Sequence, residues 1–517
     1  MTDRLRKTGK VALVGAGPGD EGLLTLRGRE WLERADVVIY DYLANKRLLR
    51  FCRPETEFVY AGKKEGKVTL SQDQINALLI EKAQLGEIVV RLKGGDPFIF
   101  GRGGEETEAL TTAGIPFVVV PGVTSPIGVA AYAGIPLTHR DYSSTLSIIT
   151  GSNEQGKEDA HIDWEKIASR SGTLIFLMGA RKLKRITENL IKYGKDPNTP
   201  IAVIQWGTTS RQKTWTGTLN TIVDIAAKEN IKPPALTIVG EVVNLKPHTD
   251  WYETLPLFGK TIVITRPEEQ SESFVNGLLE RGAEPFLFPV IETVPPDDWK
   301  PLDEAIQKLD TYDGLIFTSV NGVKFFMRRI NDLGKDVREL KGLRLYAIGS
   351  KTEKEVNALG IKVDVVPENF VAESLLDSLG KESVKGKRFL LPRAAVARET
   401  LPDQLRKRGA EIDVPAAYRT VRPQTDAAEL SRRIKEGSVH AVTFTSSSTV
   451  THFMELIGEE LKPQLENIPI ACIGPVTAKT AEKAGLNVAI MADEYTVDGL
   501  IHALEEHFRS RSSHPTN

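Results

Sequence analysis

Cysteine is scarce in this chain of 517 residues, which has only Cys52 and Cys472. Two cysteines so far apart make neither a disulfide framework nor a cysteine zinc site. No run approaches the ~20 apolar residues that cross a bilayer. The first ten residues, MTDRLRKTGK, lack the apolar core of a secretory signal. We therefore expect a cytoplasmic protein with no membrane partner.

An excess of charge of one sign is also missing. Lys and Arg number 67 against 69 Asp and Glu, so the net charge is −2. A protein that coats nucleic acid would carry a large basic excess, so we expect no nucleic-acid partner. Hydrophobic residues make up 41% and charged residues 26%, as in ordinary globular proteins. At ~150 residues per domain, the length predicts about three compact units.

Short apolar runs alternate with helix-like runs along most of the chain. VVIY at 37–40 and ALTIV at 235–239 are typical of the apolar runs. This alternation predicts an α/β protein with largely parallel sheets and buried strands. The stretch 245–258 is polar, contains proline and has no period, so we expect a linker there.

The second half contains an internal repeat. FTSVNGVKFFM at 317–327 matches FTSSSTVTHFM at 444–454, and three other pairs recur in the same order at nearly the same offset. A period of this length indicates a duplicated lobe, because solenoid repeats are only ~20–50 residues long. Two similar lobes imply a cleft between them, and such clefts often bind ligands.

The first glycine loop, VALVGAGPGDEG at 11–22, only partly fits a dinucleotide fingerprint. Asp20 stands where the third glycine belongs, and Pro18 removes a backbone donor. Both changes weaken a phosphate cradle, so an NAD site is disfavoured and a plain turn is the alternative. RLKGGDPFIFGRGGEE at 91–106 is also rich in glycine, which allows close approach of backbone to a ligand. Loops at the carboxyl ends of parallel strands are where α/β proteins bind ligands.

Five motifs of the first half carry a family resemblance. GAGPGD, VVIYD, GGDPFIFGRGGEE, VPGVTS and AGIPLTHRD resemble, in this order, the tetrapyrrole methyltransferases, above all the uroporphyrinogen-III C-methyltransferases. The resemblance covers about residues 9–245. It implies two α/β subdomains with S-adenosyl-L-methionine between them, two methylations of uroporphyrinogen III at C-2 and C-7, and a homodimer through this half. The cofactor positions that it implies are Pro18, Gly94, Gly95, Asp96, Ile99, Thr124, Ser125, Met178, Gly207 and Ala235.

The same resemblance implies an acid–base pair, Asp41 in VVIYD and Lys63 in YAGKKEG. Asp41 would accept the proton lost after each methylation, and Lys63 would donate one or hold a substrate carboxylate. The alternatives are that Asp41 merely caps a helix and that Lys63 is a surface charge. His139 and Arg140, in LTHRD, are candidates for contacts with substrate carboxylates. Many relatives carry Arg after this Asp, where this chain has Tyr42.

Small hydroxyl residues follow the strand-like runs of the second half. ThrSer at 318–319 and ThrSerSerSer at 445–448 each precede a helix-like stretch. An N-cap explains one hydroxyl per site, although not four in a row. Hydroxyl and N–H groups at helix starts suit carboxylates. No Ser–His–Asp or Cys–His arrangement and no metal-ligand cluster is visible, so we expect no nucleophilic or metal enzyme in this half.

Six motifs of the second half, ITRP, FTSVNGV, AIGSKT, AAYRT, FTSSSTV and CIGPVTA, resemble uroporphyrinogen-III synthase over about 259–508. The resemblance implies a reaction without cofactor that closes hydroxymethylbilane to uroporphyrinogen III with ring D inverted. Tyr418, in AAYRT, would assist departure of the hydroxyl group, or is a packed strand tyrosine. The substrate contacts that it implies are Thr318, Ser319, Ser446, Ser447 and Thr477.

Together these motifs predict a bifunctional enzyme of tetrapyrrole biosynthesis on the route to sirohaem and cobalamin. We expect a methyltransferase at 1–248 and a synthase at 258–508. In the synthase, one lobe would combine 259–292 with 423–508, and the other would span 297–418. The alternatives are a methyltransferase acting on ribosomal RNA or a modified protein, and a C-terminal half that only binds ligands.

Overall fold

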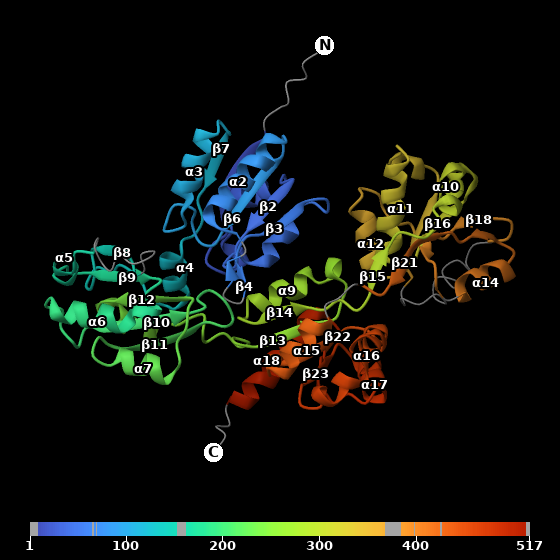
Figure 1. The fold of residues 1–517 in the computed structure, drawn as a ribbon. Coiled ribbons are helices and arrows are strands. Elements are labelled where there is room, and N and C mark those ends of the chain that lie inside the picture. Colours follow the sequence, from blue (N-terminus) through green and yellow to red (C-terminus); the bar gives the residue numbers. More distant parts are fainter. Residues whose placement is uncertain are drawn as a thin grey trace, which may run out of the picture. The chain divides into compact units, whose positions relative to one another are not determined.

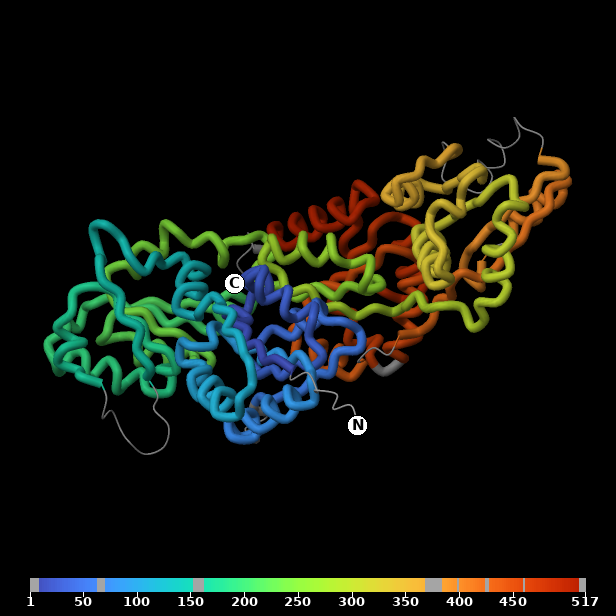
Figure 2. The backbone as a smooth tube through the Cα atoms, turned by 90° about the horizontal axis from the view of Figure 1, so that it is seen from above, coloured from blue at the N-terminus to red at the C-terminus, as the bar shows by residue number. Residues whose placement is uncertain are grey.

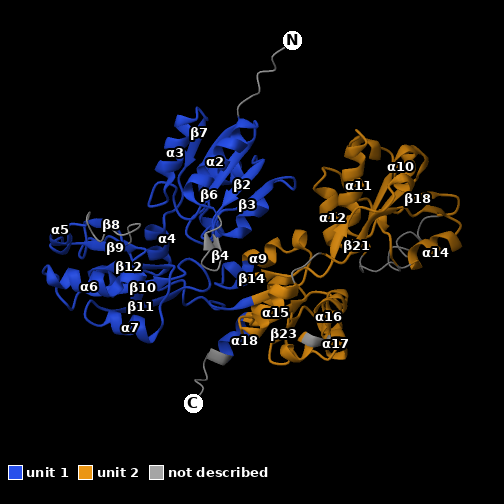
Figure 3. Ribbon diagram, in the orientation of Figure 1, with its two compact units in different colours: residues 1–261, 277–284, 505–517 blue, residues 262–276, 285–504 orange. Residues whose placement is uncertain are grey.

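The computed structural model describes residues 9–64, 67–68, 70–151, 162–367, 384–397, 399–423 and 427–512. The chain forms two compact units, each described here by itself (Figure 3). Unit 1 comprises residues 1–261, 277–284 and 505–517, and unit 2 comprises 262–276 and 285–504. Both units combine helices with sheets, so the predicted α/β class is confirmed. Within the described ranges, no helix is long and apolar enough to cross a membrane.

The first sheet of unit 1 is entirely parallel, with strand order β3-β2-β6-β1-β7 (Figure 1). Alternate residues of β1 enter two different cores, with Ala12 and Val14 in one and Val11 and Leu13 in the other. Strands buried on both faces read as continuous apolar runs, as the sequence predicted. The strands are β1 (Lys10–Gly15), β2 (Val37–Tyr40), β3 (Glu57–Tyr60), β6 (Ile88–Lys93) and β7 (Phe117–Val120). The helices of this part are α1 (Leu26–Leu32), α2 (Gln72–Gln84) and α3 (Gly103–Thr112).

The second sheet of unit 1 has the order β11-β10-β12-β9-β8 and is mixed. Only β8 and β9 pair in parallel; β10 is antiparallel to β11 and β12, and β12 is antiparallel to β9. The expectation of largely parallel sheets is therefore wrong here, because a buried apolar run reads the same in either direction. The strands are β8 (Leu146–Thr150), β9 (Thr173–Leu177), β10 (Pro200–Gln205), β11 (Lys213–Thr218) and β12 (Ala235–Val239).

Helix α4 (Ser125–Tyr132) connects the two sheets of unit 1, which form the blue and the cyan-to-green parts of the trace (Figures 1 and 2). It follows β7 of the first sheet directly. Its residues Val129 and Ala130 pack in one core with Ile175 and Ile238 of the second sheet. The second sheet is accompanied by α5 (Trp164–Ala168), α6 (Leu183–Lys192) and α7 (Ile222–Lys228).

The predicted linker at 245–258 is packed instead of free. Tyr132 of α4 meets Trp251 and Tyr252 edge-on, with ring centroids 5.1 and 4.7 Å apart. Glu253 accepts hydrogen bonds from Gln212 at 2.9 Å and from Thr214. The linker expectation is wrong because Tyr252 is buried against Tyr132, a packing that the polar composition of the segment hides. Its regular elements are η4 (Glu241–Leu245) and α8 (Lys246–Thr249).

The C-terminal half contains two parallel sheets. One has the order β14-β13-β22-β23-β24, so segments far apart in the sequence share it. The other has the order β17-β16-β18-β20. The strands of the first are β13 (Thr261–Ile264), β14 (Glu284–Leu287), β22 (Ala441–Phe444), β23 (Ile470–Cys472) and β24 (Val488–Met491). Those of the second are β16 (Gly314–Phe317), β17 (Arg344–Ala347), β18 (Arg388–Leu390) and β20 (Glu411–Asp413).

The internal repeat occupies equivalent places in these two sheets. Its copies at 317–327 and 444–454 end β16 and β22 and begin the helices α11 (Val320–Asp332) and α16 (Ser447–Leu461). A third, three-stranded sheet has the order β15-β21-β19. Its strands are β15 (Glu292–Val294), β19 (Arg393–Ala394) and β21 (Ala416–Val421). Further helices are α9 (Glu272–Leu279), α10 (Lys300–Gln307), α12 (Ser350–Asn357), α14 (Thr400–Lys407), α15 (Ala427–Lys435), α17 (Pro475–Lys483) and α18 (Val497–Ser512).

Candidate active sites

Three glycine loops meet at the carboxyl ends of β1, β6 and β7. Gly17 and Gly95 exchange two backbone hydrogen bonds, of 3.2 and 2.8 Å. A Cβ atom on Gly15 would lie 2.5 Å from Cα of Gly122, and one on Gly122 would lie 2.3 Å from the carbonyl oxygen of Gly95. No side chain fits between backbones this close, so the approach of the loops requires glycine.

Asp96, a predicted cofactor residue, ties these loops together. Its Oδ1 accepts the backbone N–H groups of Phe98 and Ile99 at 2.8 and 3.2 Å. Its Oδ2 accepts the N–H of Gly122 at 3.0 Å. The carboxylate therefore fixes the shape of two loops, which places the other predicted positions.

The same region concentrates strained backbone. Non-glycine residues at positive φ are costly, at roughly 1–3 kcal/mol each, and they gather at functional sites. In the described residues, five of the six such positions lie in loops that carry predicted cofactor residues. Phe100 and Arg102 lie in the loop of Ile99, and Trp206 and Thr208 lie in the loop of Gly207. The fifth position is Met178 itself.

The N-terminus of α4 is the centre around which more predicted residues gather. Thr124 is its N-cap residue, and its side chain makes no capping hydrogen bond. A Cβ atom on Gly95 would lie 3.7 Å from the backbone nitrogen of Ser125. Pro18 and Gly207 approach the same helix. A Cβ atom on Gly128 of the helix would lie 2.6 Å from the side chain of Pro18, and one on Gly207 would lie 2.4 Å from the side chain of Val129. An uncapped helix N-terminus beside glycine loops suits a carboxylate.

The remaining predicted cofactor positions are Ile99, Met178, Ala235 and Gly94. Ile99 and Met178 are among the exposed large apolar side chains. Ala235 begins β12 opposite Gln205 of β10, next to the Gly207 loop. A Cβ atom on Gly94 would lie 2.6 Å from the Cβ atom of Leu43. Gly94 therefore adjoins the turn that follows Asp41.

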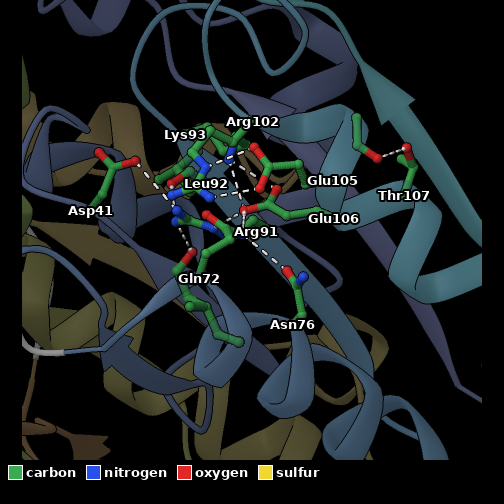
Figure 4. A network of polar contacts seen from close by, with 12 residues as sticks. Asp41, Gln72, Asn76, Arg91, Leu92, Lys93, Arg102, Glu105, Glu106 and Thr107 are labelled. Carbon is green, nitrogen blue, oxygen red and sulfur yellow. Dashed lines mark hydrogen bonds and ion pairs between the residues drawn. The ribbon is translucent and has the colours of Figure 1, made fainter. Parts of the chain in front are cut away.

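Asp41 follows β2 and uses its two carboxylate oxygens differently. Oδ1 accepts the backbone N–H groups of Leu43 and Ala44 at 3.0 and 3.2 Å, as a capping aspartate does. Oδ2 faces the guanidinium of Arg91, 3.6 Å from Nη2 (Figure 4). The side chain is 27% exposed. Oδ1 therefore holds the turn after β2 and does not cap a helix, because the next helix, η2 (Lys46–Phe51), has Asn45 as its N-cap.

Behind Asp41 lies an ion network that the sequence analysis missed (Figure 4). Glu106 of α3 is fully buried, and it accepts from Arg91 Nε at 3.1 Å and from Lys93 Nζ at 2.8 Å. Burial lowers the pKa of Lys93, the charge of Arg91 acts in the same direction, and Glu106 opposes both. The available signal was the apolar strand IVVRLK, in which two cations two residues apart required an acidic partner.

The other predicted substrate residues of this half are Lys63, His139 and Arg140. Lys63 lies in the short strand β4 (Lys63–Lys64), and its side chain is outside the described part of the structure. His139 is held in a turn by two backbone hydrogen bonds with Ser143, and its Nδ1 accepts the N–H of Asp141 at 3.2 Å. Arg140 is exposed. Among the described residues, neither His139 nor Arg140 makes a hydrogen bond or ion pair to Asp41 or to the glycine loops.

In the C-terminal half, the structure brings Ser319 and Tyr418 together. Ser319 caps α11 by accepting the N–H of Gly322 at 3.0 Å. Its Oγ also lies 3.0 Å from the phenolic oxygen of Tyr418. Tyr418 is buried and stacks on Phe325, with ring centroids 5.7 Å apart. The tyrosine is therefore a packed strand residue whose hydroxyl has a polar partner.

The second hydroxyl group has partners of its own. Ser446 caps α16 by accepting the N–H of Thr449 at 3.3 Å. Ser447 accepts the hydroxyl of Thr480 at 2.9 Å. Thr477 is buried in α17, and Thr318 is half-buried after β16. Ser319 and Ser446 therefore cap the helices that follow two equivalent strands, β16 and β22, and Ser447 links α16 to α17.

Other reactive groups are few in the described ranges. No three His, Cys, Asp or Glu side chains there lie close enough to hold a metal ion. Both cysteines are free thiols. Burial raises the pKa of Cys52 to about 11 and that of Cys472 to about 12, so neither resembles an activated nucleophile.

Comparison with known proteins matches the two halves of the chain to two different families. Residues 10–223 match the family of Tetrapyrrole (Corrin/Porphyrin) Methylases, and residues 272–502 match Uroporphyrinogen-III synthase HemD. The fold and these matches define a tetrapyrrole methylase joined to a uroporphyrinogen-III synthase, so both resemblances in the motifs are confirmed. The chain belongs to the family of the porphyrin biosynthesis protein HemD, with which it aligns along nearly its whole length.

Relatives cover both halves. The chain is 37% identical over 498 residues to the porphyrin biosynthesis protein HemD of Ruminiclostridium josui, covering 96% of this chain and 98% of that protein. It is 35% identical to a uroporphyrinogen-III C-methyltransferase of Bacillus subtilis (strain 168), covering 92% and 93%. A crystal structure of uroporphyrin-III C-methyl transferase from Thermus thermophilus with S-adenyl homocysteine is 41% identical, covers 46% of this chain and all of that chain, and has a TM-score of 0.40. The alternatives of an RNA or protein methyltransferase and of a mere binding module are not favoured.

Proposed function

We propose that the chain carries out two consecutive steps of tetrapyrrole biosynthesis. The C-terminal half, 258–508, closes hydroxymethylbilane to uroporphyrinogen III with ring D inverted. The N-terminal half, 1–248, then methylates that product at C-2 and C-7 to give precorrin-2. The observation that carries the proposal is the match, over nearly the whole chain, to a relative in which the same two domains are fused. The sheet shared by β13, β14 and β22–β24 supports a lobe built from 259–292 and 423–508.

The N-terminal half fits S-adenosyl-L-methionine better than a dinucleotide. The uncapped N-terminus of α4 beside Gly95 would hold a carboxylate, and the exposed side chains of Ile99 and Met178 would pack against an apolar group. Asp20 gives the first glycine loop a negative charge, which disfavours a pyrophosphate there. When bound, S-adenosyl-L-methionine supplies an already activated methyl group, so the protein has mainly to position it.

Asp41 is the proposed base of methyl transfer. The methylated ring must lose a proton, and Oδ2 of Asp41 is bound to no backbone N–H in the described structure. A positioned base of this kind contributes roughly 10²- to 10⁴-fold to a rate. Lys63, His139 and Arg140 are proposed to meet carboxylates of the substrate.

The C-terminal half is proposed to work mainly by holding a flexible chain in one curled shape, without a cofactor. Tyr418 and Ser319 supply a hydroxyl pair for the departing hydroxyl group. Thr318, Ser446, Ser447 and Thr477 would share the binding of the substrate carboxylates. Such contacts are individually weak, so that binding does not depend on any one of them.

One reconstitution tests both activities. The purified full chain is incubated with hydroxymethylbilane, with and without S-adenosyl-L-methionine, and the products are separated by isomer and mass. We expect uroporphyrinogen III in both cases and a dimethylated product only with the cofactor. Isomer I as the sole product would overturn the synthase proposal, and absence of methylated product would overturn the methyltransferase proposal.

The proposal extends to a cytoplasmic homodimer joined through the methyltransferase half. Light scattering of the full chain and of variants with charges placed on that half tests the assembly. A monomer at micromolar concentration would contradict it.

A further inference from the structure

Arg91 connects the proposed base to a buried carboxylate (Figure 4). Arg91 and Lys93 occupy alternate positions of β6, so both side chains leave the same face of the strand and reach Glu106. Arg91 also donates from Nη1 to the carbonyl of Ile39 at 3.3 Å, two residues before Asp41. The guanidinium therefore spans β2 and β6, and its Nη2 lies 3.6 Å from Oδ2 of Asp41.

The charges of this network balance, with two cations and two carboxylates. The side chains of Arg91, Lys93 and Glu106 are at most 5% exposed, whereas Asp41 is 27% exposed. Replacing buried ion groups with apolar residues is often neutral or stabilising, so stability alone gives little reason for such a network. The most exposed residue of the network is Asp41, the proposed base. We therefore look for the role of the network in the action of that base.

Among the described side chains, Arg91 makes the ion pair with Oδ2 of Asp41. The turn after β2 uses Oδ1, through the N–H groups of Leu43 and Ala44. The pKa of Tyr60 of β3 is raised mainly by burial and next by the charge of Asp41. Lys93 pairs with Glu106 in the described structure, and its charge reaches Asp41 only at longer range.

We propose that Arg91 is a positioning residue for methyl transfer, which holds Oδ2 of Asp41 in the orientation that accepts the substrate proton. Glu106 fixes the guanidinium from behind, and Lys93 supplies the second positive charge that Glu106 and Asp41 together require. The inference rests on the proposed function of the N-terminal half, because it assigns Arg91 a role through Asp41.

The first test separates positioning from folding. Arg91→Met should lower kcat for uroporphyrinogen III on the order of 30- to 100-fold, because a misplaced catalytic group costs about that much. The KM for uroporphyrinogen III and the affinity for S-adenosylhomocysteine should stay within about 3-fold of wild type, and Arg91→Lys should regain part of the rate. An unchanged kcat, or a loss confined to KM and cofactor affinity, would overturn the proposal.

A double-mutant cycle supplies the sharper test. In the Asp41→Asn background, Arg91→Met should cost less than about 3-fold more, because residues that act through one another are not additive. Lys246→Met is the control, because Lys246 is a largely buried lysine of the same unit that pairs with Asp250 outside this network, and its effect should add to that of Asp41→Asn. Additive effects for Arg91 would overturn the inference. Where Arg91→Met does not fold, the cycle is run with Arg91→Lys. A wild-type chain that methylates nothing would instead overturn the proposed function.

Discussion

The two halves of the molecule place their polar groups in opposite ways. Around Asp41, charged side chains are buried together, and neighbouring loops contain strained backbone and glycines with no room for a side chain. In the C-terminal half, the candidate residues are hydroxyls that cap helices or bond to near neighbours. The first arrangement concentrates function in a few groups, whereas the second spreads it over many. Single substitutions should therefore be severe in one half and mild in the other.

The largest effect is expected at Asp41. Asp41→Asn keeps the size of the side chain and removes the base, so kcat for methyl transfer should fall about 10³-fold. The measurement is the initial rate of transfer from labelled S-adenosyl-L-methionine to uroporphyrinogen III. Synthase activity of the same variant is the internal control and should be unchanged. A loss smaller than 3-fold would show that methyl transfer does not depend mainly on Asp41.

The next effect is expected at the crossing of the glycine loops. The Cβ atom of Gly122→Ala would lie 2.3 Å from the carbonyl of Gly95, so the loops must separate. We expect the affinity for S-adenosylhomocysteine, measured by calorimetry, to fall about 100-fold, the scale of a 1 Å misplacement. Gly104→Ala is the matched control, since its Cβ atom would meet nothing within 4 Å. Equal affinities for the two variants would refute the crowding argument.

A smaller effect is expected at Tyr418. Tyr418→Phe removes the hydroxyl beside Ser319 and should slow uroporphyrinogen III formation about 10-fold, which is less than the roughly 10²- to 10⁴-fold of a positioned acid or base because the work is shared. Tyr312→Phe is the control, because Tyr312 is also buried and bonds to Asp413 through its hydroxyl. That variant should lose stability and keep its turnover. A 10³-fold loss in Tyr418→Phe would break the comparison, since the second half would then depend on one group.

The hydroxyl caps should matter less to catalysis than to stability. Ser446→Ala removes the N-cap of α16 and should cost about 1 kcal/mol in the free energy of unfolding. Synthase activity should stay within about 3-fold of wild type, because carboxylate binding is shared. Denaturant unfolding and initial rates measure the two quantities. A loss of activity without a loss of stability would show that synthase activity depends strongly on Ser446.

The smallest effect concerns the thiols, one in each half. Burial raises the pKa of Cys52 to about 11 and that of Cys472 to about 12, above the ordinary 9.0. The folded state therefore favours the neutral thiols, and their contribution to stability is present below pH 9 and is lost as the pH rises further. At pH 8 both should alkylate slowly until the chain is unfolded. Mass spectrometry of iodoacetamide adducts measures this, and fast native modification of either would contradict it.

The sequence was informative where local chemistry leaves a visible pattern. Continuous apolar runs such as VVIY predicted buried strands correctly, and the glycine motifs lie, as expected, in loops after β1 and β6. The direction of β10 and β12 was not predictable, because burial on both faces gives the same apolar run for either orientation. Trp251 and Tyr252 were misread because polar residues flank the pair, and Tyr132, against which both rings pack, lies far away in the chain.

The ion network shows the same limit at the candidate site. Asp41 could be found from its motif, but the two cations of the apolar strand IVVRLK do not say which acidic residue pairs with them. Their pairing depends on α3 lying over β6, which no local pattern specifies. Likewise, the motifs predicted both Tyr418 and Ser319 as site residues but not the contact between them, because they lie 99 residues apart.

The packed segment after η4 also decides where the protein can be divided in the laboratory. A fragment that stops at residue 248 would leave Tyr132 without the rings of Trp251 and Tyr252, and Gln212 without Glu253. Such a fragment would expose an apolar patch on α4, the helix whose other end forms part of the candidate cofactor site. Expression of the N-terminal enzyme alone therefore calls for a boundary beyond Glu253, and a shorter fragment should aggregate and bind the cofactor weakly.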